Sequence, residues 1–377
     1  MPKFNEIKET ARLLSFYCLI AFSVSLFVSI TVSAVFFVLG IAFWLSTCKF
    51  WNPKLNILNW SVLIWAVIQF SISFIHGGFE NILSNTKDTF QMFVPWFWIT
   101  SLLASIKRKR LRILTQSLII IGSIVGVLVV FQSQGLFVRS DRGPSGFLYQ
   151  PMTTSGLLLL TTAISLNFTM LLKRAKVKIL TTFYLLLTAL QAFSNLVIGQ
   201  RSILLATFVG FVLWLFLNFK TLGFKSILNT FVLSSFSLLM AYYSSDKLRT
   251  KVSSLFHIYK DKVGLGCRLE VWKQNLISFW KEPFVGSGKP VIYNCFGDIL
   301  GHAHNIYINQ LVSYGLVGFL PLINFFVGAI IRLLKRKNRS AFIVAFVAIL
   351  IHGCFETWWG DSEITSAFWV FLALGLV

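Results

Sequence analysis

Residues 301–319 read GHAHNIYINQLVSYGLVGF, and they mark the point where a polar segment gives way to a long apolar one. The 60 or so positions before this stretch carry many charged side chains, whereas residues 305–331 carry none. An apolar helix of that length can cross about 30 Å of hydrocarbon, so we expect a membrane span to begin here. His304 and Asn305 then lie at a boundary where one side chain can meet both an aqueous and a lipid-borne reactant.

The whole chain has the composition of a membrane protein. Of its 377 residues, 56% are hydrophobic and 12% are charged, whereas about 25% of residues are charged in soluble domains. Apolar stretches long enough to span a bilayer recur along the sequence, and the period-2 alternation of a membrane β-barrel is absent. The sequence therefore predicts an all-α polytopic membrane protein, with residues 1–377 forming a single integral membrane domain.

Twelve transmembrane helices account for these stretches. We expect two of them in a tight hairpin over 13–48, and the others at 56–75, 89–106, 113–132, 151–172, 179–198, 202–219, 226–243, 304–331, 340–355 and 364–377. Alternate loops then hold 21 of the 34 Lys and Arg residues against only Glu6 and Glu9. By the positive-inside rule these loops are cytoplasmic, as are both termini. The net charge of +21 thus reflects topology and does not indicate binding to nucleic acid.

The predicted spans contain no Asp, Glu, Lys or Arg. Ion-coupled transporters usually carry buried charges near the midplane of the membrane. A transporter or flippase for a lipid-linked glycan stays open as an alternative, but it would need a polar path that these spans scarcely offer. We expect the chemistry at the outer, periplasmic face instead.

Arg201 is a candidate ligand for a phosphate group at that face. Only residues 199–201 join two predicted spans, so the guanidinium group is held near the membrane surface. Its planar fork of donors suits a diphosphate better than a lysine would. The alternative is a helix-end arginine that reaches toward lipid headgroups.

The largest outer loop, residues 244–303 between the ninth and tenth spans, contains the segment 266–290. Apolar residues recur in it at helical spacing, which predicts an amphipathic helix lying in the interface and touching membrane lipids: Leu269, Trp272, Leu276, Phe279 and Trp280. Arg268, near its start, could add a second phosphate contact. Cys267 and Cys295 both fall in this loop, on the oxidising side, where a disulfide between them would brace it.

His304 is the candidate general base. A neutral imidazole titrates near physiological pH, which suits proton transfer. The alternative is that His304 and Asn305 only cap the tenth span. His302 lies two positions earlier, so the two imidazoles would point to different faces of a helix, and no acidic or cysteine cluster completes a metal site.

Three segments resemble the O-antigen ligase and polymerase superfamily: SNLVIGQRSILLATFVGF (194–211), GCRLEVWKQNLISFWKEPFVGSGKP (266–290) and the opening stretch. The resemblance covers 190–325, and RGPSGFLYQP (142–151) is similar to a Gly-rich outer loop of that family. The positions that match its motifs are Arg201; Arg268, Leu269, Glu270 and Trp272; Pro283, Gly286 and Gly288; and His304, Asn305, Gly315, Leu316 and Gly318.

The resemblance implies transfer of a glycan from undecaprenyl diphosphate to an acceptor hydroxyl at the periplasmic face of a Gram-negative inner membrane. His304 would be the base, and Arg201 and Arg268 would bind the diphosphate, in an inverting reaction without metal or cofactor. We favour a ligase that uses lipid A-core as the acceptor; a polymerase that extends a lipid-linked glycan is the alternative. Further candidate substrate contacts are Arg139, Arg142, Lys289, His302 and Asn305.

Overall fold

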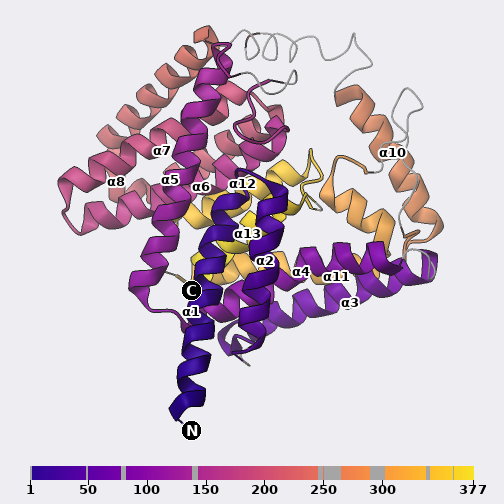
Figure 1. Ribbon diagram of the computed structural model, residues 1–377. Helices are drawn as coiled ribbons and strands as arrows, with labels where there is room; N and C mark the ends of the chain where they lie inside the picture. Colours follow the sequence, from indigo (N-terminus) through magenta and orange to yellow (C-terminus); the bar gives the residue numbers. More distant parts are fainter. Residues whose placement is uncertain are drawn as a thin grey trace.

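The computed structural model describes residues 2–47, 50–77, 82–137, 143–244, 249, 265–288, 302–336, 340–359 and 361–377. All regular structure in this part of the chain is helical (Figure 1). Long apolar helices dominate it, so the protein is an all-helical, polytopic membrane protein as the composition predicts.

The helices follow one another with short connections. The first part of the chain forms α1 (Pro2–Ser25), α2 (Ile30–Leu45), the 3-10 turn η1 (Pro53–Leu55), α3 (Asn56–Gly77), α4 (Ile82–Ser105) and α5 (Arg108–Ser133). The second part forms α6 (Pro151–Arg174), α7 (Lys178–Ile198), α8 (Arg201–Ser244), α10 (Leu265–Lys281), α11 (Ile306–Leu334), α12 (Ser340–Gly353) and α13 (Ser362–Leu376).

Six described helices are long and apolar enough to cross a membrane: Pro53–Gly77, α5, α6, α7, the Arg201–Asn218 part of α8, and α11. Three shorter apolar helices, α2, α12 and α13, fall where further spans are predicted. One difference concerns the eighth and ninth predicted spans, which form a single helical stretch, α8. The segment that was expected to separate them, 220–225, lacks proline and contains one glycine, so nothing in it forces the helix to end. The number of twelve spans stays a prediction.

The last helix, α13, lies in the middle of the bundle (Figure 1), and nearly all its side chains are buried. Trp369 is its central aromatic residue. The Trp369 ring centroid lies 5.2 Å from that of Trp96 on α4, 5.3 Å from Phe325 on α11 and 5.4 Å from Trp359 in the loop before α13. Such aromatic contacts are mutually attractive and bury large apolar areas, so they anchor the loop that precedes α13.

Buried amide groups also connect the helices that position α11. Gln69 on α3 donates to Gln310 on α11 at 2.6 Å, and the Trp65 indole donates to the same oxygen at 3.3 Å. Trp96 on α4 donates to Asn59 on α3 at 2.9 Å. Hydrogen bonds of this kind join membrane helices, where apolar contact with lipid offers no advantage over contact with another helix.

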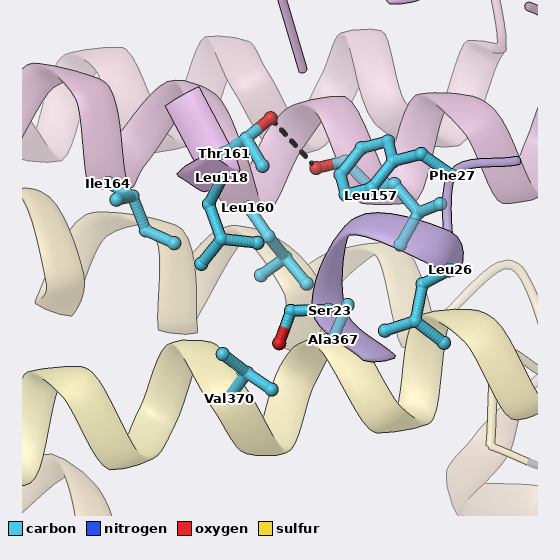
Figure 2. Close-up of a pocket in the computed structure, with 10 residues that line it drawn as sticks. All are labelled: Ser23, Leu26, Phe27, Leu118, Leu157, Leu160, Thr161, Ile164, Ala367 and Val370. Atoms are coloured by element: carbon cyan, nitrogen blue, oxygen red, sulfur yellow. Dashed lines mark hydrogen bonds between the residues drawn. The ribbon is translucent and has the colours of Figure 1, made fainter. Parts of the chain in front are cut away.

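A small internal cavity of about 10 Å³ lies among α1, α5, α6 and α13 (Figure 2). Its polar groups are bonded within their own helices, Ser23 to the carbonyl of Leu19 and Thr161 to that of Leu157. The remaining lining is apolar, and the space is at the lower limit for one water molecule. It is a packing defect of the core.

Candidate active site

Four connections between helices meet around a cavity of about 360 Å³. It is lined by residues 150–152 at the start of α6, Gln200 before α8, His302 and His304 before α11, and Glu356 and Thr357 between α12 and α13. These connections are the ones that the charge pattern assigns to one side of the membrane. Gln200 and His304, which are about 100 positions apart in the chain, thus share one cavity.

The chain turns sharply at His304. This residue has a left-handed backbone, with φ of 49°, which only a few per cent of non-glycine residues adopt. Asn305 then returns to an extended conformation and caps α11, its side-chain oxygen accepting from the amides of Tyr307 at 2.9 Å and Ile308 at 3.0 Å. The Asn305 amide donates to the Cys354 carbonyl at 2.9 Å. Asn305 therefore caps the helix and ties it to the end of α12, as the capping alternative predicts, while the His304 imidazole lines the cavity.

Glu356 is the partner of His304. Its Oε2 lies 3.0 Å from the His304 Nδ1, and its Oε1 accepts from the Arg268 guanidinium at 2.5 Å. Burial by itself would raise the pKa of Glu356, but the His304 hydrogen bond and the Arg268 charge outweigh it and lower that pKa below its ordinary value. An ionised carboxylate facing Nδ1 favours the tautomer that carries its proton there, and this leaves Nε2 as the basic nitrogen.

The sequence analysis missed Glu356. The residue is 52 positions from His304 and 88 from Arg268, and it lies between the last two predicted spans. The sequence offered one indication of an acidic partner. Glu356, Asp361 and Glu363 lie close together in a predicted outer loop, on the same side of the membrane as several basic residues. That pattern alone does not say which acid meets which base.

The loop that carries Glu356 is firmly held. The next two aromatic side chains are buried, Trp358 completely and Trp359 to 5% exposure. Trp358 donates to the Ile349 carbonyl at 3.1 Å, and the Trp359 ring stacks on Trp65 with centroids 4.5 Å apart. The backbone amide of Glu356 itself bonds the His352 carbonyl at 3.0 Å. These contacts hold the carboxylate in place before any substrate arrives.

Arg268 stands on α10 and points to the same loop. Besides its bond to Glu356, it donates to the Phe355 carbonyl at 2.6 Å. Trp272, one turn further along α10, donates to the Ala303 carbonyl at 2.9 Å, next to His304. Arg268 was expected to bind the diphosphate. Two of its N–H groups are instead bonded to the protein, and 28% of its side chain remains exposed.

Helix α10 is amphipathic, and one of its faces packs against the rest of the protein. The buried side chains are Val271, Asn275 and Phe279, spaced four residues apart. Of the predicted stripe, Phe279 is buried, Trp272 is half-buried and Leu269, Leu276 and Trp280 are exposed. The stripe therefore spans two faces of the helix, because positions four apart share one face whereas 279 and 280 do not. Contact of its exposed members with membrane lipids stays a prediction.

A backbone clip joins the end of α10 to α11. Helix α11 breaks at Gly315, whose φ of 60° and ψ of −167° suit glycine alone. The amides of Ser287 and Gly288 donate to the carbonyls of Val312 and Ser313, both at 2.9 Å. In return, the amides of Leu316 and Val317 donate to the carbonyls of Pro283 and Phe284 at 2.9 and 3.1 Å. The clip satisfies groups that a broken helix leaves unpaired, and it fixes the position of α10 and hence of Arg268.

Arg201 is the first residue of α8, and it is exposed. Gly199 ends α7 in the left-handed conformation, with φ of 65° and ψ of 34°, which lets the next helix begin two residues later. Gln200, which lines the cavity, immediately precedes Arg201. The two arginines therefore differ in how they relate to the cavity. Arg268 bonds Glu356, which lines the cavity, and Arg201 directly follows Gln200, which also lines it.

His302 lies against His304, with ring centroids 4.4 Å apart and an interplanar angle of 86°. Burial, followed by the nearby His304, lowers the pKa of His302, so its ring is neutral at physiological pH. Within the described chain, no group of three or more His, Cys, Asp or Glu side chains is arranged to hold a metal ion.

Several predicted residues fall outside this description. Arg139, Arg142, Lys289 and Cys295 lie outside the described residues, and so does most of the 244–303 loop. The bridge between Cys267 and Cys295 stays a prediction, as do the three basic residues as substrate contacts.

Comparison with known proteins bears on the motif region. Residues 186–323 match the family described as O-antigen ligase. A search of curated proteins finds no match to this chain. The matched segment agrees closely with the predicted region 190–325, and it contains Arg201, Arg268, His304 and both glycine motifs, so the resemblance is confirmed. The match over residues 186–323 supports a place for this segment in the O-antigen ligase superfamily.

Proposed function

We propose that this protein is an O-antigen ligase, which transfers a glycan from undecaprenyl diphosphate to a hydroxyl group of lipid A-core at the periplasmic face of the inner membrane. The family supports a lipid-linked glycan substrate. The observation that carries the proposal is the His304–Glu356 pair, 3.0 Å apart in the wall of a cavity at one end of a membrane bundle. Such a pair supplies a general base at neutral pH.

In the proposed reaction, the acceptor hydroxyl binds to Nε2 of His304. Its oxygen attacks the anomeric carbon of the donor sugar while its proton passes to Nε2. The bond from the anomeric carbon to the phosphate oxygen breaks, and the electron pair leaves with undecaprenyl diphosphate. Attack from the face opposite the leaving group inverts the anomeric configuration. Glu356 stabilises the imidazolium that forms, as a carboxylate does beside other catalytic histidines.

Arg201 is the proposed ligand of the departing diphosphate. It is exposed at the first turn of α8, where the helix amide groups also favour an anion. Arg268 contributes its positive charge from behind Glu356, and its remaining N–H groups are available to the phosphate oxygens. Together they would neutralise the charge that develops on the leaving group.

His304→Asn tests the base directly, because asparagine tolerates the left-handed backbone at this position. We expect transfer to fall by at least about 100-fold, the usual contribution of a general base. The assay is transfer in proteoliposomes, with the amount of folded protein in the membrane as the control. Transfer at the wild-type rate would sink the assignment of His304 as the base.

The ligase and polymerase reactions are separated in cells. Lipopolysaccharide and lipid-linked glycan are extracted from a strain that lacks the protein. A bare lipid A-core with long polymer left on undecaprenyl diphosphate is the expected result. A core that carries one repeat unit would instead identify a polymerase, and an unchanged ladder would contradict both assignments.

A further inference from the structure

The cavity beside His304 has a charge that does not suit a diphosphate. None of the described residues that line it is a lysine or arginine, and the carboxylate of Glu356 forms part of its wall. A diphosphate placed there would meet a like charge at close range. Building on the proposed function, we infer that the cavity is the binding site of the acceptor sugar, with Gln150 and Gln200 as its specificity-determining residues, while the diphosphate stays outside at Arg201.

The neutral groups of the cavity match a sugar. The side-chain amides of Gln150 and Gln200 can each donate and accept hydrogen bonds, as sugar hydroxyls do. Neither amide bonds another residue within the described structure. Pro151 and Met152 add an apolar surface for the C–H groups of a sugar ring. The volume of about 360 Å³ lies at the lower end of ligand pockets.

Two buried polar atoms beside the cavity have no partner in the described chain. They are the Thr357 hydroxyl oxygen and Nδ1 of His302. Buried polar groups are nearly always paired in folded proteins, so each unpaired atom calls for a partner that is missing here. A polyhydroxyl ligand, or a water molecule held by it, would supply one.

The position of the cavity fits the reaction. His304 lines it, and because Nδ1 faces Glu356, Nε2 is the nitrogen left for an acceptor hydroxyl. Gln200 directly precedes Arg201 in the chain. An acceptor sugar bound to Gln200 would therefore lie next to the residue that is proposed to bind the diphosphate. The attacking hydroxyl would then stand between the base and the donor.

The test separates the affinity for the acceptor from that for the donor. The full-length protein in proteoliposomes receives a fluorescent undecaprenyl-diphosphate-linked oligosaccharide as donor. The acceptor probes are lipid A-core and an unlabelled undecaprenyl-diphosphate-linked repeat unit. For the probe that wild type uses, Gln150→Ala and Gln200→Ala should each raise the acceptor KM about tenfold, the effect of one lost hydrogen bond, and leave the donor KM unchanged. Gln274→Ala, an exposed glutamine on α10, is the matched control and should change neither constant.

A second variant fills the space. Met152→Trp should abolish use of the acceptor while the protein still binds the fluorescent donor. The subsite is wrong if the glutamine variants raise the donor KM alone, or if neither constant changes while His304→Asn remains inactive; the proposed function survives both results. Absence of transfer by wild type to either probe would overturn the function and the subsite together.

Discussion

The imidazole of His304 differs from an ordinary surface histidine because one of its nitrogens is bonded to a buried carboxylate. Glu356 is 11% exposed at its side chain, and a second partner, Arg268, holds its other oxygen. This arrangement fixes the tautomer and the orientation of the ring before substrate binds. Glu356 thus determines how well the base works by holding the imidazole, without taking the proton itself.

Glu356→Gln should lower kcat by about 100- to 1,000-fold, because a neutral amide cannot stabilise the imidazolium. The pKa of Glu356 is lowered, so the wild-type carboxylate is ionised throughout the neutral range. We therefore expect the charge of the carboxylate, and with it a loss of kcat in the variant, to be present throughout the range from about pH 6 to pH 8. Rates measured across that range provide the check, and Glu270→Gln, on the exposed side of α10, is the control. A kcat equal to that of wild type would show that His304 needs no carboxylate.

Arg268 and Glu356 should act as a unit. Removing either partner breaks the same ion pair, so the double variant Arg268→Ala/Glu356→Gln should lose less activity than the product of the two single losses. A double-mutant cycle on kcat measures this coupling. If Arg268 acted only on the diphosphate, independently of Glu356, the two losses would multiply.

At the scale of the element, the clip between residues 283–288 and 312–317 explains why this region needs its glycines. A Cβ on Gly315 would lie 2.2 Å from the Phe284 carbonyl oxygen, and one on Gly286 would lie 2.6 Å from the Gly315 amide. Neither neighbour can give way, because both are backbone atoms held by the hydrogen bonds of the clip. The broken helix is tolerated at membrane depth since protein groups satisfy its backbone.

Gly315→Ala should therefore release the loop from α11 and destabilise the protein. Gly135→Ala is the matched control, because Gly135 also has a positive φ, of 83°, but no atom lies within 4 Å of its added Cβ. We expect the control to lose about 1–2 kcal/mol from backbone strain alone, and Gly315→Ala to lose clearly more. Thermal unfolding in detergent compares them. Equal unfolding temperatures for the two variants would mean that the clip adds no stability.

At the scale of the whole molecule, the site is assembled from four connections at one end of the bundle, and the helices below it are sealed by aromatic packing around α13. One part of the structure differs from the predicted topology: α8 is continuous through the basic segment 220–225. The excess of Lys and Arg predicts that this segment faces the cytoplasm.

Reporter fusions after Thr221 test that topology. A fluorescent protein that matures only in the cytoplasm should be bright there, and alkaline phosphatase, which needs the periplasm, should be inactive. Fusions after Gln200 should give the reverse result, because residues 199–201 are predicted to face the periplasm. Active phosphatase after Thr221 would remove the eighth and ninth spans from the scheme and place the segment 220–225 on the periplasmic side, while the other loops would keep their predicted sides.

The helical membrane architecture, the motif region and the candidates Arg201, Arg268 and His304 could all be predicted from the amino-acid sequence. Hydrophobicity and charge act locally: each apolar stretch must become a helix in lipid, whatever surrounds it. Three features became visible only in the folded protein: Glu356 joins Arg268 to His304, a loop closes the break in α11, and the buried face of α10 consists of Val271, Asn275 and Phe279. These features depend on which residues 52 or 88 positions apart come into contact, and packing of the whole bundle sets those distances.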